Sequence, residues 1–214
     1  SAPAGIVLIQ SSSATGGGVQ VHGSTSAASS ANSIEAIQLV GGNKQTYQFL
    51  SNNGDIDIAS ITDEPKAFIY VYADTYLGQR KDSAAIQGVD PISGSTNAVT
   101  SFRADKFIDF PKTDSIFGQG FVEIYPFTSS KSISINTSEG DLYVDELENI
   151  RNTFQGIVIG DSTNTNGISS TNDVNFKSPI TFNPGASGIS FTYKVTSSGV
   201  NATFAGDSDS TISA

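Results

Sequence analysis

Histidine and cysteine, the residues most often used in catalysis and metal binding, are nearly absent from this chain. His22 is the only histidine and there is no cysteine. A histidine-based catalytic triad, a multi-histidine metal site, a zinc finger and thiol chemistry are therefore excluded. We interpret His22, in the segment Val19-Gln20-Val21-His22, as an exposed strand residue.

Carboxylates are the remaining groups that could carry acid–base chemistry. Glycoside hydrolysis needs two acids about 5–10 Å apart across the sugar. Asp55 with Asp57 and Glu146 with Glu148 have an i, i+2 spacing that would place each pair on one face of a strand. The same spacing is typical of a strand with one solvated face. We favour the solvated face and expect neither catalytic nor cofactor-binding residues.

Aspartates in polar turns are candidate ligands for calcium, which prefers carboxylate and carbonyl oxygens. They are Asp161, Asp173, Asp207 and Asp209. None has EF-hand spacing, so uncomplexed polar loops are the alternative.

Three tyrosines close together in the sequence could stack against a sugar. Tyr70 and Tyr72 share a strand face with Phe68 by their spacing, and Tyr76 follows. Packing in a core with the hydroxyl groups at its edge is the alternative reading. A carbohydrate-binding module remains the second hypothesis for the function.

The distribution of charge indicates which partners to expect, and the first residues indicate where the protein is located. The net charge is −10, every Lys or Arg lies at or beyond Lys44, and the only adjacent basic pair is Arg80-Lys81. Nucleic acid and anionic membranes need clustered cations, so we expect neither as partner. No apolar run of about 18 residues is present to span a membrane.

The start Ser1-Ala2-Pro3 indicates a removed leader or excision from a longer protein, which favours an extracellular or cell-surface location.

Short apolar–polar alternations separated by turn residues predict an all-β fold over residues 1–214, as a single domain or a segment of a solenoid. Only 145–154 offers a helical stripe, through Leu147, Ile150 and Phe154. Alternation alone does not choose between a β-solenoid and a β-sandwich or jelly-roll. The expected strands are 5–9, 19–21, 37–40, 47–49, 56–58, 67–72, 107–110, 121–125, 133–135, 142–144, 157–159, 180–182 and 189–193.

The C-terminal part of the chain carries a recognisable sequence pattern. Ser132-Ile133-Ser134-Ile135 is followed by Phe154-Gln155-Gly156-Ile157-Val158-Ile159-Gly160 and by Val174-Asn175-Phe176-Lys177-Ser178-Pro179-Ile180-Thr181-Phe182. Over residues 131–191 this resembles the filamentous-haemagglutinin-like large exoproteins of cyanobacteria and other bacteria. The resemblance implies a right-handed parallel β-helix with an adhesive or structural role at the outer surface.

We therefore expect a non-enzymatic, extracellular structural or adhesive protein whose main partners are copies of itself, with surface glycans as possible partners. Exposed strand edges at the ends of a β array favour self-association. The apolar segment Ile6-Val7-Leu8-Ile9 could be added to a neighbour's sheet, with residues 1–18 acting as an extended strand and a Gly/Ser linker. Alternatively, it is the first strand of the chain's own core.

Overall fold

The structure is a computed structural model of the 214-residue chain. It describes residues 5–11, 19–23, 37–40, 45–51, 56–60, 68–72, 74–79, 99–118, 120–137, 140–205 and 211–212. Side chains are described for Ile58 and within 99–205.

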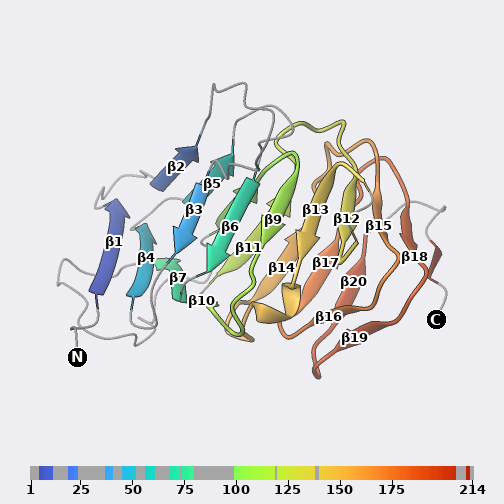
Figure 1. Ribbon diagram of the computed structural model, residues 1–214. Helices are drawn as coiled ribbons and strands as arrows, with labels where there is room; N and C mark the ends of the chain where they lie inside the picture. The colour runs from blue at the N-terminus through green and yellow to red at the C-terminus, as the bar shows by residue number, and fades with distance from the viewer. Residues whose placement is uncertain are drawn as a thin grey trace.

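The predicted all-β class is confirmed, and the strands of each sheet run parallel to their neighbours throughout the described residues. Figure 1 shows them side by side along one direction, from the N-terminus at one end to the C-terminus at the other. The N-terminal sheet contains β1 (Gly5–Ser11), β4 (Gln45–Ser51), β7 (Asp74–Gln79) and β10 (Ile116–Gly118), in that order. We call it sheet A.

Two longer sheets continue past sheet A to the C-terminal end. Sheet B orders β2 (Val19–Gly23), β5 (Ile56–Ser60), β8 (Val99–Arg103), β11 (Phe121–Tyr125), β14 (Gly156–Ile159), β17 (Ile180–Phe182) and β20 (Ala202–Phe204). Sheet C orders β3 (Ile37–Val40), β6 (Phe68–Tyr72), β9 (Phe107–Asp109), β13 (Leu142–Asp145), β12 (Ile133–Ile135), β15 (Ile168–Ser170), β18 (Ile189–Phe191) and β21 (Thr211–Ile212).

The chain visits these sheets in a repeating order. From β1 to β12 it passes from sheet A to B to C and then back to A. After β15 the place of sheet A in this order is taken by a two-stranded sheet D, formed by β16 (Val174–Phe176) and β19 (Val195–Ser197). A bridge between Ile116 and Ile150 extends the pairing of β10 beyond sheet A. Each sheet therefore gains strands in steps as the chain advances.

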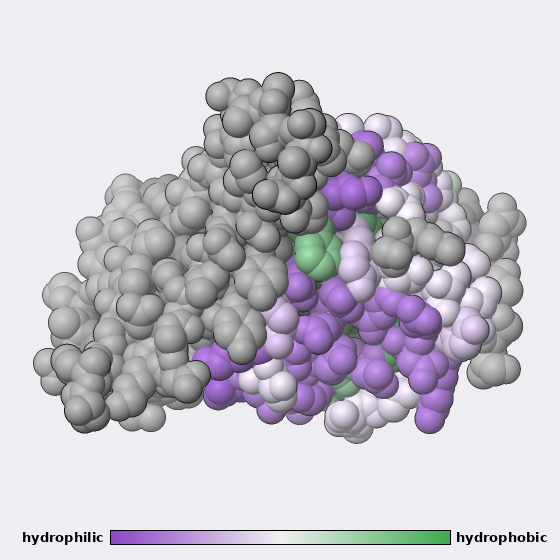
Figure 2. Space-filling model, viewed as in Figure 1, coloured by the Kyte–Doolittle hydropathy of each residue, from purple (hydrophilic) through white to green (hydrophobic). Residues whose placement is uncertain are grey.

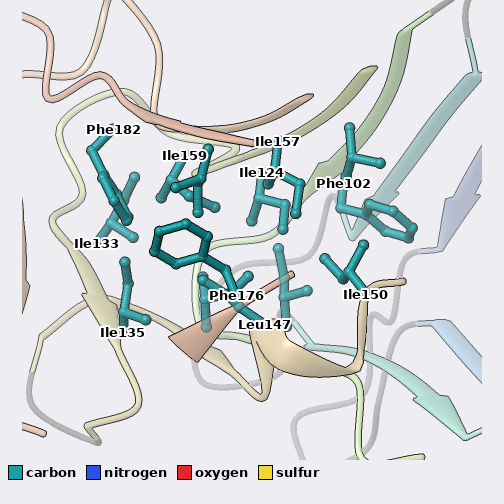
Figure 3. Close-up of a cluster of buried hydrophobic side chains, with 14 of the residues drawn as sticks. Phe102, Ile124, Ile133, Ile135, Leu147, Ile150, Ile157, Ile159, Phe176 and Phe182 are labelled. Carbon is teal, nitrogen blue, oxygen red and sulfur yellow. The ribbon is translucent and has the colours of Figure 1, made fainter. Parts of the chain in front are cut away.

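The core consists of rows of apolar side chains that run across the strands. Ile58, Phe102, Ile124, Ile159 and Phe182 are successive register partners in sheet B, and each is fully buried. Figure 3 shows these residues of β8 to β17 facing residues of β12, the segment 147–150 and β16. The rows are what the alternating pattern predicts, because in-register parallel strands place like positions on one face.

Sheet C contains one strand more than sheet B because the chain steps back once. β12 and β13 pair in parallel, with Ile133 opposite Leu142, although only residues 136–141 join them. In the sheet, β13 therefore lies between β9 and β12, although it follows β12 in the sequence. Asp141 secures this short connection by accepting hydrogen bonds from the Ser132 backbone N–H (2.9 Å) and hydroxyl (3.0 Å).

The segment 145–154 forms a 3-10 turn, η1 (Leu147–Asn149), in place of a longer helix. Leu147, Ile150 and Phe154, the predicted apolar stripe, are all buried. The apolar stripe is therefore buried as expected, although no helix longer than this turn forms, and Leu147 and Ile150 face the sheet B residues across the core (Figure 3).

The predicted self-association segment, Ile6 to Ile9, lies in β1 and pairs with Thr46 to Phe49 of β4. β1, β2 and β3 are the first strands of sheets A, B and C, and β20 and β21 are the last strands of B and C among the described residues. The proposed linker, 12–18, lies outside them.

Candidate functional site

Two aspartates lie side by side where neighbouring strands of sheet C end. Asp109 is the last residue of β9 and Asp145 the last of β13, and the two are register partners. Register partners in a parallel ladder share a face of the sheet. Both carboxylates therefore lie on one face, and the buried Ile108 and Val144 lie on the other. Hydrophilic residues dominate the described part of the surface in this view (Figure 2).

Two glutamates continue the cluster into η1. Glu146 has a left-handed backbone conformation, with φ of 57°, and its N–H donates to the Asp145 carboxylate at 3.0 Å. Its own carboxylate accepts a hydrogen bond from the Asn149 amide at 3.4 Å, and Asn149 also donates to the Phe110 carbonyl at 2.8 Å. The unusual conformation of Glu146 thus turns the chain from sheet C into η1. We call Asp109, Asp145, Glu146 and Glu148 the carboxylate corner.

Asp109 is the most buried member of the carboxylate corner, with 9% of its surface exposed, and its Oδ1 has no hydrogen-bond partner. Burial raises its pKa to about 7, with further contributions from the charges of Glu146 and Asp145, against a backbone hydrogen bond from Phe110. Burial and the charges of Asp145 and Glu148 also raise the pKa of Glu146. The Glu148 Oε2 is a second buried oxygen without a partner. Two oxygens of the carboxylate corner therefore accept no hydrogen bond, and its carboxylates repel one another.

Two aromatic rings lie beside the aspartates on the same face. Phe107 and Tyr143, each two residues before its aspartate, stack with ring centroids 4.9 Å apart and an interplanar angle of 19°. Burial raises the pKa of the Tyr143 hydroxyl, and its hydrogen bond to Asp145 raises it further. The hydroxyl is thus a donor to Asp145 at neutral pH.

The structure brings together one of the two predicted carboxylate pairs. Glu146 and Glu148 interact electrostatically in the carboxylate corner. Asp57 lies in β5 opposite Ser101, and Asp55 is outside the described residues. Sequence reasoning did not single out Asp109 and Asp145. The repeated order of an aromatic, an aliphatic and an aspartate residue in 107–109 and 143–145 is the signal that could have found them.

The predicted calcium ligands lie at separate turns. The Asp161 carboxylate accepts hydrogen bonds from the backbone N–H and hydroxyl of Thr163, and that of Asp173 accepts one from the Lys194 N–H. Asp207 and Asp209 lie outside the described residues. Where the structure describes side chains, no three His, Cys, Asp or Glu residues form a group that could hold a metal ion. Calcium binding stays a prediction.

The predicted sugar-stacking tyrosines are divided between two sheets. Tyr70 and Tyr72 lie in β6 of sheet C, where Tyr70 is the register partner of Asp109, whereas Tyr76 lies in β7 of sheet A. His22 lies in β2, opposite Ala59. The backbone therefore places Tyr70, but not Tyr76, in the sheet that holds the carboxylate corner.

No helix in the described part of the chain is long and apolar enough to cross a membrane. Comparison with protein families, with curated proteins and with solved structures found no match to this chain.

Proposed function

We propose that the chain is a right-handed parallel β-solenoid that serves as a non-enzymatic structural or adhesive protein outside the cell. One observation carries the proposal: parallel strands are added in turn to sheets A, B and C as the chain advances, and D later takes the place of A. Coils that stack in this way build an extended body with strand edges at its ends. The filamentous-haemagglutinin-like pattern over residues 131–191 supports the same architecture and location.

Self-association through the end strands is the mechanism that we propose. The terminal strands of a parallel sheet present backbone N–H and C=O groups that can pair with another chain. On either side of β20, the Asn201 carbonyl accepts a hydrogen bond from the Ile180 N–H (3.0 Å), and the Ala205 N–H donates to the Phe182 carbonyl (2.9 Å). Because backbone groups alternate in direction along a strand, those of Ala202 and Phe204 point away from β17.

The experiment removes one outward-pointing donor. Ala202→Pro deletes an N–H on the open edge of β20 and leaves the bonds of residues 201 and 205 to β17 in place. Ala202→Ser, the matched control, changes the side chain at the same position and keeps the N–H. Light scattering and negative-stain electron microscopy measure assembly, and circular dichroism checks folding.

We expect the unsubstituted chain and Ala202→Ser to form rods or fibres, and Ala202→Pro to form fewer and shorter ones. A compact monomer for all three proteins at high concentration contradicts self-assembly. Assembly that is equally strong in the folded Ala202→Pro variant contradicts pairing through this edge.

A further inference from the structure

The two edges of sheet B match each other in direction and register. All its strands run parallel, and the register does not shift between them: the buried row that contains Ile159 begins at Val21 of β2 and ends at Phe204 of β20. β2 and β20 lie toward opposite ends of the molecule (Figure 1). The β2 strand of a second copy, added to β20 in the same direction, would therefore continue the sheet.

The backbone groups on these two edges are complementary. The Ile180 N–H points toward β20 and donates there at 3.0 Å, and Ile180 shares a register row with Val19 of β2 and Ala202 of β20. The backbone groups of this row therefore point toward the C-terminal end of the sheet. Because these groups alternate in direction along a strand, Ala202 points outward from β20 and Gln20 points outward from β2. In the same register, the Gln20 N–H of one copy would donate to the Ala202 carbonyl of another.

Charged side chains are scarce in the segments that contain the end strands. Outside residues 44–194 the only ones are Glu35, Asp207 and Asp209, although the whole chain has 11 basic and 21 acidic residues. The first strands, β1 to β3, and the last strands, β19 to β21, all lie in these two outer segments. Two copies stacked end to end would bring few like charges together, and depletion of charge is typical of the centre of a protein interface.

The last coil holds apolar side chains that the core leaves partly exposed. Val195 of β19, Val200 and Phe204 of β20 pack against the core but are only partly buried. The Phe204 ring stacks on Phe182, its register partner, with centroids 5.3 Å apart, and Phe182 is fully buried. One more strand beyond β20 would remove further apolar surface of this coil from water.

We propose that copies of this chain stack head to tail, with β20 of one copy paired in parallel with β2 of the next. In this arrangement Thr203 lies opposite Gln20, and Phe204 lies opposite Val21. The inference rests on the proposed self-association through end strands and adds the partner strand, the orientation and the register. A head-to-tail contact can be repeated without closing, so it builds a filament. Pairing of two β20 strands would be antiparallel and would end at a dimer.

Introduced cysteines test the strand, the orientation and the register together. The chain has no cysteine of its own, so a disulfide reports only on the introduced positions. Gln20 and Thr203 lie in the outer row of sheet B, which alternates with the buried row. Neighbouring strands are about 4.8 Å apart, a Cα separation that a disulfide spans. Gln20→Cys and Thr203→Cys chains are mixed, oxidised and separated by non-reducing electrophoresis. His22→Cys mixed with Thr203→Cys is the control, two residues out of register.

We expect the Gln20→Cys and Thr203→Cys mixture to give on the order of tenfold more covalent dimer than either variant alone or the control mixture, because Cα atoms more than about 7 Å apart are not bridged. Dimers of Thr203→Cys with itself overturn the proposal, since they show β20 paired with β20. Equal cross-linking in the control mixture overturns the register.

Chains with one blocked edge give a second, non-covalent measurement. Ala202→Pro blocks β20, and Gln20→Pro removes the N–H that points outward from β2, while Gln20→Ser keeps it. Circular dichroism checks folding, and light scattering measures mass. A 1:1 mixture of the two proline variants should contain dimers of twice the chain mass, because one free β2 edge meets one free β20 edge, and each variant alone should be smaller on average.

The unsubstituted chain separates failure of this inference from failure of the proposed function. If it assembles but the mixture of proline variants is no larger than each variant alone, head-to-tail pairing of β20 with β2 is overturned and self-association stands. If the unsubstituted chain stays a monomer at high concentration, both are overturned.

Discussion

Asp109 and Asp145 are register partners at the ends of parallel strands β9 and β13, and the more buried of the two, Asp109, has an oxygen without any hydrogen-bond donor. A pair of carboxylates on adjacent strands destabilises the sheet when both are charged.

Asp109 should make the chain less stable as the pH rises. Its pKa is about 7 in the folded state, mainly because of burial, and about 3.9 in an unfolded chain. Between these values the folded state binds more protons, so stability falls from about pH 4 to pH 7 and then levels off. Asp109→Asn should raise the melting temperature by at least ~3 °C at pH 8 and have little effect at pH 4.

Thermal melts followed by circular dichroism at both pH values measure this difference. Asp161→Asn, which changes a carboxylate that accepts hydrogen bonds from Thr163, serves as the control and should not stabilise the chain at pH 8. A melting temperature of the Asp109→Asn variant that is below that of the unsubstituted chain at pH 8 contradicts the prediction.

Gly160 directly follows β14, at a position where no side chain fits. Its φ is 82°, and a Cβ there would lie 2.1 Å from the carbonyl oxygen of Asn183, which directly follows β17, the next strand of sheet B. Gly160→Ala should therefore reduce the free energy of unfolding by more than the ~1–2 kcal/mol of a left-handed backbone alone. Gly199, with φ of 74° and nothing within 4 Å, is the matched control.

Urea unfolding of Gly160→Ala and Gly199→Ala compares the two sites. If the two variants lose the same stability, the close approach of Asn183 to Gly160 does not contribute.

The all-β class and the inner rows of the core could be predicted from the sequence, because alternation reports directly which residues face inward. Ile133-Ser134-Ile135 and Ile157-Val158-Ile159 are strands with their isoleucines fully buried, as expected. Strands with few large apolar residues were not predicted. Examples are β8 (Val99–Arg103) and β15 (Ile168–Ser170), which are strands because their backbones pair with stronger strands on both sides.

The carboxylate corner could be predicted only in part, because it depends on which strands become neighbours. Glu146 and Glu148 are close in sequence and were singled out. Asp109 and Asp145 are brought together by the pairing of β9 with β13, and that pairing requires the chain to step back after β12. The alternation within each strand contains no information on this step.

The buried row of sheet B should carry much of the stability. Ile159 is fully buried between Ile124 and Phe182, whereas its neighbour Val158 lies on the outer face. Ile159→Ala should reduce the free energy of unfolding by about 2–5 kcal/mol, since it leaves a cavity in a packed row. Val158→Ala, on the same strand, should cost less than about 1 kcal/mol. Equal losses in chemical denaturation would contradict the assignment of inner and outer faces.

Asp141 should stabilise the connection that allows β13 to pair next to β12. Burial raises the pKa of Asp141, but hydrogen bonds from Ser132 and the charge of Lys131 outweigh it and hold the pKa below its usual value. The stabilisation is therefore present at neutral pH and is lost as the pH falls through the folded-state pKa. Asp141→Ala should reduce the stability at pH 7 by about 1 kcal/mol, because it removes the acceptor for the Ser132 N–H and hydroxyl.

Hydrogen exchange gives the local measurement for this connection. The Leu142 N–H donates to the Ser132 carbonyl at 2.9 Å, so its exchange should accelerate in Asp141→Ala. Lys131→Gln is the control: it removes a 3.5 Å ion pair of two partly exposed side chains and keeps the hydrogen bonds between Asp141 and Ser132, so it should have little effect. If Lys131→Gln accelerates exchange as much as Asp141→Ala does, the ion pair and not the Ser132 hydrogen bonds holds β12 and β13 together.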